Sequence, residues 1–181
     1  GNLLTAFDAA VVSAAARPDS DTRLSAVLDT AQTLAQKINS IANTIQSART
    51  SAEQTIANDV ARLNSALDQV TSLNKQIASL TARGKDASSM MDSRQAVIDG
   101  ISAIVPIRQV PRDHGQVALF TTGGAVLLDG TNPARVGFSR ADPVTVGMSL
   151  AAGTLSNLTF NDSQLTSFQQ AAMFSGGTLG A

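Results

Sequence analysis

The chain has 181 residues, of which 43% are hydrophobic and 15% charged, with one histidine and no cysteine, tryptophan or tyrosine. This composition supports a buried core but excludes disulfide scaffolds, thiol nucleophiles and a zinc site built on cysteine or several histidines. A formal net charge of -1 gives no electrostatic attraction to nucleic acid or to an anionic membrane. The chain begins with Gly1 and not with Met, so we expect an excised internal piece of a longer protein.

Residues 2–105 are predicted to be helical, because they contain a single proline and apolar residues at helical spacing. The first helix is predicted to end before Pro18, which disfavours the α conformation of the residue that precedes it. Its apolar face consists of Leu3, Leu4, Phe7, Ala10, Val11 and Ala14. Ser20 or Asp21 is suited to begin a second, very long helix over about residues 20–83.

Heptad spacing of apolar residues runs through this long helix, as in a coiled coil. One row repeats every seven residues and a second row follows three residues behind; the rows consist of Leu24, Ala31, Ile38, Ile45 and Ala52, and of Val27, Leu34, Ile41 and Ala48. Beyond Ala52 the pattern resumes after a four-residue shift, which is a stutter. The resumed rows are Ile56, Leu63, Val70 and Ile77, and Ala66, Leu73 and Leu80.

Gly84 is placed to terminate the long helix, and Asp86 or Ser88 to begin a third one. The third helix carries Met90, Met91, Val97, Ile98, Ile101 and Ile104. We therefore expect the three helices to form an antiparallel bundle over residues 1–105. Outside the apolar rows the long helix is covered by neutral polar residues with few charges, which suits packing against other protein.

From Pro106 onward the apolar residues alternate with a period of two and are separated by Gly, Asn-Pro and Asp-Pro breakers, which indicates short antiparallel strands and tight turns. The predicted fold class is α+β: a long antiparallel, coiled-coil-like helical bundle at 1–105, followed by a small antiparallel β domain at 106–181 that is truncated at its C-terminal end. Apolar clusters are present at 136–138, 144–146 and 155–160.

Two sequence features resemble parts of enzyme sites. His114 lies between Asp113 and Gly115, but a Ser-His-Asp relay would need a serine and an aspartate brought to opposite sides of its ring, whereas these residue types are typical of a tight turn. Gly123-Gly124 resembles part of a phosphate-binding loop, yet the Lys-Ser/Thr that must follow is replaced by Ala-Val-Leu-Leu. We interpret both segments as turns between strands.

The remaining candidate residues are also explained by structural roles that involve no ligand and no catalysis. Asp92 and Asp99 lie seven residues apart on the third helix near Arg94, which is the pattern of a solvated or salt-bridged face. Arg108 and Arg112 lack the basic density and the aromatic platforms of nucleic-acid readers. Met90 and Met91 fit core filling at helical spacing. We predict no catalytic, cofactor-binding or metal-binding residue, and no cofactor.

Several segments together resemble the flagellar hook-associated protein 1 (FlgK) family. Residues 18–39 are similar to the start of that family's long helix, and residues 60–78 to its continuation, in which Asn64 and Asn74 each follow a leucine of the apolar rows. Residues 90–102 are similar to its Leu-Leu-Asp-x-Arg helix, with Met90 and Met91 in the leucine places. Residues 123–130 resemble its Gly-Gly hairpin, and residues 176–181 its return toward the C-terminal helices.

The resemblance implies an extracellular structural subunit, exported unfolded, that joins hook and filament by lateral packing. The implied partners are other copies of the chain and neighbouring axial proteins of the flagellum, with no nucleic acid and no membrane. The family's terminal assembling segments are absent, so this piece is expected to be monomeric on its own. The alternative is an extracellular sensory or adhesin-type helical module, which should carry ligand-binding arginines or aromatic residues between its helices.

Overall fold

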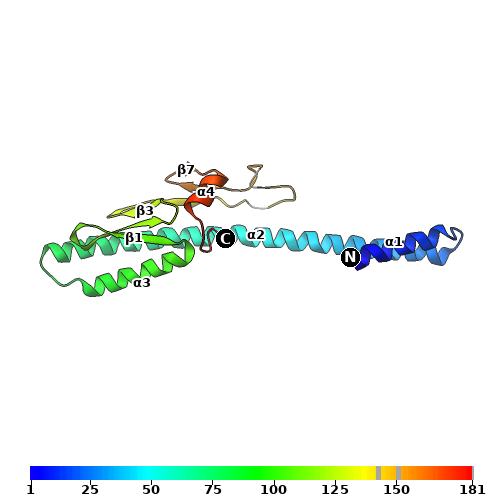
Figure 1. Ribbon diagram of the computed structural model, residues 1–181, viewed down its shortest axis with the longest axis horizontal. Helices are drawn as coiled ribbons and strands as arrows, with labels where there is room; N and C mark the ends of the chain where they lie inside the picture. Colours follow the sequence, from blue (N-terminus) through cyan, green and yellow to red (C-terminus); the bar gives the residue numbers. More distant parts are fainter. Residues whose placement is uncertain (142–143, 150–151, 181) are drawn as a thin grey trace. The chain divides into compact units, whose positions relative to one another are not determined.

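The computed structural model describes residues 1–141, 144–149 and 152–180. It confirms the predicted fold class, with a very long helix, shorter antiparallel helices and small antiparallel sheets (Figure 1). The chain divides into two compact units, residues 1–49 and residues 50–181. The boundary predicted at residue 105 lies where helix α3 ends and the strands begin.

The first unit is a pair of helices. Helix α1 spans Asn2–Ala15, and the first part of helix α2, which spans Asp21–Ala82, runs beside it (Figure 1). The guanidinium of Arg23 donates to the carbonyl of Ser13 at 2.6 Å across the turn. Much of the predicted apolar pattern is nevertheless uncovered here, with exposed Leu3, Leu4, Val11, Leu24, Ile38, Ile41 and Ile45.

Helix α2 ends as its sequence predicts. The amide of Lys85 donates to the carbonyl of Leu80 and the amide of Gly84 to that of Thr81, both at 3.0 Å. Gly84 takes a φ of 64°. This is the paired hydrogen-bond pattern of a Schellman C-cap, in which the left-handed residue is normally glycine. Helix α3 follows at Ser88–Ile104.

The buried face of α2 in the second unit differs by one row from the prediction. Leu63, Val70 and Ile77 of the predicted first row are fully buried. The predicted companions Ala66, Leu73 and Leu80 are half-buried, and the buried companion row is Val60, Leu67 and Asn74. A polar asparagine therefore occupies a core position. From α3, Ile98, Ile101 and Ile104 join the same hydrophobic core.

Two small antiparallel sheets complete the second unit. The first has the order β1-β2-β3-β4 and the second the order β5-β6-β7. The strands are β1 Ile107–Pro111, β2 Val117–Thr121, β3 Val126–Asp129, β4 Asn132–Pro133, β5 Val136–Phe138, β6 Leu158–Phe160 and β7 Ser163–Gln164. Buried Leu119, Leu127 and Leu128 from the first sheet, and Val136 and Leu158 from the second, join the helical core.

Helix α4, Ser167–Met173, was not predicted from the sequence. It begins with a capping box in which Thr166 accepts from the amide of Gln169 while the Gln169 side chain accepts from the amide of Thr166. The sequence contains the capping signal Thr-x-x-Gln, but the helix that follows is only seven residues long, too short for apolar periodicity to identify it. The apolar cluster at Val144 to Val146 forms no strand.

Candidate functional site

The side chain of Asn74 links α2 to the first sheet from within the core. It is 0% exposed. Its Nδ2 donates to the carbonyls of Val117 at 2.9 Å and Gly130 at 2.7 Å, and its Oδ1 accepts from the amide of Val117 at 3.3 Å and from Arg94 at 2.8 Å. Because the amide's donors and acceptors are all used, this buried polar group carries little desolvation penalty.

Arg94 extends this arrangement to α3. Arg94 is 8% exposed, and its Nη1 donates to the carbonyl of Gly115 at 2.7 Å as well as to the Oδ1 of Asn74. Burial lowers the pKa of the guanidinium. Among the described residues no carboxylate lies within ion-pair distance of it, so its charge is held by neutral oxygens. Arg94 thus joins α2, α3 and the turn before β2.

Arg94 does not share a face of α3 with Asp92 and Asp99. Asp92 and Asp99 are exposed, whereas Arg94 is buried on another side of α3. Asp99 accepts a hydrogen bond of 2.8 Å from Gln95 on its own helix. The two carboxylates belong to a solvated helix face, as expected, and not to an acid–base pair.

Asn64 makes an equivalent contact with the second sheet. Its Nδ2 donates to the carbonyl of Val136 at 2.7 Å, and its Oδ1 accepts from the amide of Val136 at 3.1 Å. One turn further along α2, Asp68 accepts two hydrogen bonds of 2.9 Å from Arg135. This bidentate ion pair is about half exposed, with side-chain exposures of 55% for Arg135 and 50% for Asp68.

Two buried carboxylates on α2 bind further parts of the β region. Glu53 accepts from the backbone amide of Ala141 at 3.1 Å. Asp59 accepts from the hydroxyl of Thr178 at 2.6 Å and from Arg62 at 3.3 Å. Together with Asn64, Asp68 and Asn74, these residues form the docking line of α2, a series of polar side chains that hold the β region against the helix.

The segment after α4 also holds the end of α3. The amide of Thr178 donates to the carbonyl of Ala103 at 3.3 Å, and the amide of Leu179 to that of Ile104 at 3.0 Å. These carbonyls lie in the last turn of a helix and lack intrahelical partners. A segment more than 70 residues away in sequence (Thr178 against Ala103) therefore caps α3.

The two enzyme-like sequence motifs lie in turns. Exposed His114 has a φ of 57° within a short 3-10 turn, Asp113–Gly115. Gly123 and Gly124 connect β2 and β3. A Cβ at Gly123 would lie 1.7 Å from the carbonyl oxygen of Ala172 in α4, so close backbone approach requires glycine at this position.

The two strand arginines have local structural partners. Arg108 stacks over the ring of Phe120, 5.8 Å from its centroid. Arg112 and Asp129 form an exposed ion pair of 2.8 Å. The hydrogen bond from Arg112 lowers the pKa of Asp129, and the same bond raises the pKa of Arg112.

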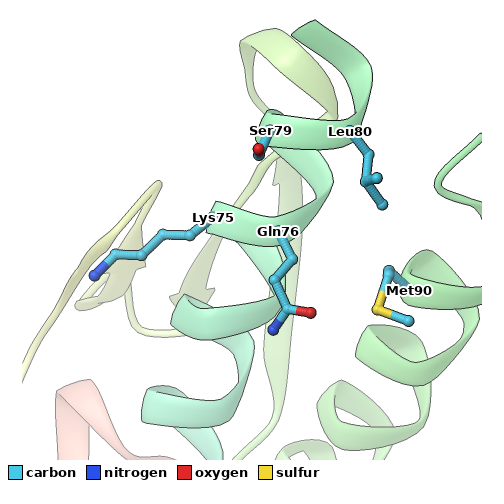
Figure 2. A pocket seen from close by; sticks show the side chains of 5 residues that line it. All are labelled: Lys75, Gln76, Ser79, Leu80 and Met90. Carbon is cyan, nitrogen blue, oxygen red and sulfur yellow. The ribbon is translucent and has the colours of Figure 1, made fainter. Parts of the chain in front are cut away.

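An open hollow of about 380 Å³ lies between α2 and α3 (Figure 2). Lys75, Gln76, Ser79 and Leu80 line it from α2, and Met90 from α3. Half-buried Met90 faces Leu80 across the hollow, while Met91 is 37% exposed. Among the described residues that line it, Lys75 alone is ionisable, and these residues offer no pair of groups for acid–base chemistry.

No group of three or more metal-binding side chains occurs in the part of the chain that the structure describes. Within the same residues, no helix combines the length and the apolar character needed to cross a membrane.

The docking line is not predicted by the sequence. Asparagine at a buried heptad position gives the same sequence signal as asparagine on a polar face, and the heptad spacing predicts Leu63 and Leu73 for the apolar rows. The available signal was the recurrence of Leu-Asn ten residues apart, at Asn64 and Asn74.

These features define the class of protein: an α+β domain whose long helix carries a docked β region, with polar side chains used for internal attachment. A family model described as the helical domain of the flagellar hook-associated protein FlgK matches residues 1–181. The chain belongs to this family.

Individual relatives agree with this assignment. The chain is 30% identical over 98 residues to flagellar hook-associated protein 1 of Bacillus subtilis (strain 168), a match covering 54% of this chain and 19% of that protein. The solved structure of the flagellar hook junction protein FlgK from Burkholderia pseudomallei shares the fold, with a TM-score of 0.77 and 20% identity over 99% of this chain and 31% of that one. The chain thus spans less than a third of the length of these relatives.

Proposed function

We propose that this chain is a structural domain of a hook–filament junction subunit and acts by packing against other protein in the flagellum. The observation that carries the proposal is the family match over the whole chain, since the relatives it matches are named as hook-associated and hook junction proteins. The proposed partners are other copies of the chain and neighbouring axial proteins outside the cell. The proposed role involves no catalysis and no cofactor.

The surface of the first unit supports a packing role. Heptad-spaced Ile38, Ile41 and Ile45 are 57%, 47% and 55% exposed in the isolated chain. Contiguous apolar surface of this kind marks a site of protein contact. Between these residues α2 presents neutral polar side chains, which add no charge that would have to be desolvated on contact.

The alternative of a sensory or adhesin module lacks comparable support. Such a module would present arginine or aromatic side chains for a ligand between its helices. Arg94 lies between α2 and α3, but its Nη1 is already used by Asn74 and Gly115.

Substitutions in the first unit test the proposal in the full-length protein. Ile38→Asp with Ile41→Asp should abolish filament attachment in cells, because charge would enter the contact surface. The matched control is Asn39→Asp with Ser40→Asp, which places the same charges on neighbouring exposed positions. Retention of helical circular dichroism in this chain shows that the fold survives. Normal attachment with the isoleucine variant would contradict the proposal.

The oligomeric state of the isolated chain gives a second test. We expect a monomer or weak association at micromolar concentration, because many modest side contacts become strong only when other segments hold subunits in register. Sedimentation velocity measures this directly, and a stable ring or filament of the chain alone would contradict it.

A further inference from the structure

The two sheets of the second unit are attached to α2 in the same way at two separate places. At each place an asparagine side chain exchanges two hydrogen bonds with the amide and carbonyl of one strand residue, Asn74 with Val117 and Asn64 with Val136. Ten residues of helix separate the two asparagines, a rise of about 15 Å.

The sheets themselves are separate. Among the described residues, strands β1 to β4 pair with one another and strands β5 to β7 with one another, and no ladder joins the two sets. The chain passes from the first sheet to the second between two adjacent residues. The amide of Ala134 donates to the carbonyl of Leu127 in the first sheet, whereas the carbonyl of Arg135 accepts from the amide of Asn161 beside the second sheet.

The surroundings of the two asparagines differ. Asn74 is fully buried, also bonds Gly130 and Arg94, and serves a sheet whose Leu119, Leu127 and Leu128 are fully buried. Asn64 is half-buried and is reinforced by the exposed Asp68–Arg135 pair. Exposed ion pairs contribute little to stability, and strands β5 to β7 are only two or three residues long.

We propose that the β region docks on α2 as two separable cooperative units, with Asn74 the positioning residue of the β1–β4 sheet and Asn64 that of the β5–β7 sheet. The β5–β7 sheet is the weaker unit and leaves α2 first, without loss of the β1–β4 sheet. Val136 and Leu158 of the β5–β7 sheet lie in the same core as the first sheet, but its strands are shorter and its ion pair with α2 is solvent-exposed. Regions with fewer buried contacts and solvent-exposed polar attachments open at lower free energy than the rest of a core, and they do so as contiguous units.

Residue-resolved hydrogen exchange of the 181-residue chain tests this proposal. The probes are the amides of Asn161 and Leu165 for the β5–β7 sheet and those of Thr121 and Ala134 for the β1–β4 sheet, each hydrogen-bonded to a backbone carbonyl. In the unmodified chain we expect the first pair to exchange faster. Asn64→Ala should accelerate the first pair by about tenfold, since two hydrogen bonds are lost, and leave the second within about twofold.

Two further variants complete the experiment. Arg135→Gln should accelerate the first pair by a smaller factor, and Asn39→Ala, on an exposed face of the first unit, should change neither pair. Equal protection of both sheets in the unmodified chain would overturn the proposal. It would also be overturned if Asn64→Ala accelerated all four probes alike, which would indicate one cooperative unit, or if it accelerated none.

Discussion

The two halves of α2 carry the same kind of heptad pattern but differ in how far its apolar side chains are buried. In residues 50–82, Leu63, Val70 and Ile77 are fully buried against α3 and the sheets. In residues 21–49, Leu24, Ile38 and Ile45 occupy the predicted row and remain exposed. Heptad spacing therefore predicts which side of a helix is apolar, but not what covers it. Burial needs a partner, and the first unit contains only α1.

The largest expected difference is between matched charge substitutions in these halves. Leu63→Asp should lower the free energy of unfolding by about 3–5 kcal/mol, because it leaves an unpaired charge in a packed core. Ile38→Asp should change it by less than about 1 kcal/mol in this chain, since the side chain is already exposed. Urea denaturation followed by circular dichroism measures both. Equal effects would remove the contrast between the two units.

Arginines in the two units provide the next comparison. Arg94→Met should cost about 1–3 kcal/mol, because oxygens of Asn74 and Gly115 would lose a buried donor. Arg23→Met removes a hydrogen bond to Ser13 at an exposed site and should cost no more than about 0.5 kcal/mol. The same denaturation experiment applies. A larger loss for Arg23→Met would mean that the first unit depends on polar contacts more than the second.

Within the second unit, two glycine substitutions should have opposite signs. Gly123→Ala should destabilise by about 1–3 kcal/mol, because its Cβ would collide with the backbone of α4. Gly100→Ala should stabilise by about 1 kcal/mol, since Gly100 lies inside α3 and a Cβ there meets nothing within 4 Å. Thermal melting gives both signs. A neutral Gly123→Ala would show that α4 does not pack closely on the turn.

The smallest effect concerns the start of α3. Hydrogen bonds from the hydroxyl and the backbone amide of Ser88 lower the pKa of Asp86. Asp86 therefore adds stability above its unfolded pKa of about 3.9, and this addition is lost as pH falls through the lower folded value. Asp86→Ala should remove that part of the pH dependence. Unfolding curves at several acidic pH values check this. The same pH dependence of the free energy of unfolding in Asp86→Ala and in the unmodified chain would contradict it.

Local chemistry made some features predictable from the sequence. The C-cap at Gly84, the turns at His114 and Gly123, and the strands that follow Pro106 each depend on a few adjacent residues with restricted backbone preferences. The docking line was not predictable in this way. Asn64 and Asn74 gain their roles from Val136 and Val117, which are distant in sequence, and the buried row of α2 shifted so that Asn74, rather than Leu73, faces the core.

The cap that Thr178 and Leu179 place on α3 has a consequence for the order of folding. Thr178 also bonds Asp59, which is 119 positions earlier in the chain. Closing a loop of that length sacrifices chain entropy before any contact compensates for it, so contacts of such long range form late. A chain that emerges N-terminus first can build α2, α3 and the β1–β2 hairpin from neighbouring segments. It cannot cap the end of α3 until Thr178 and Leu179 have emerged, so completion of this helix reports the arrival of that segment.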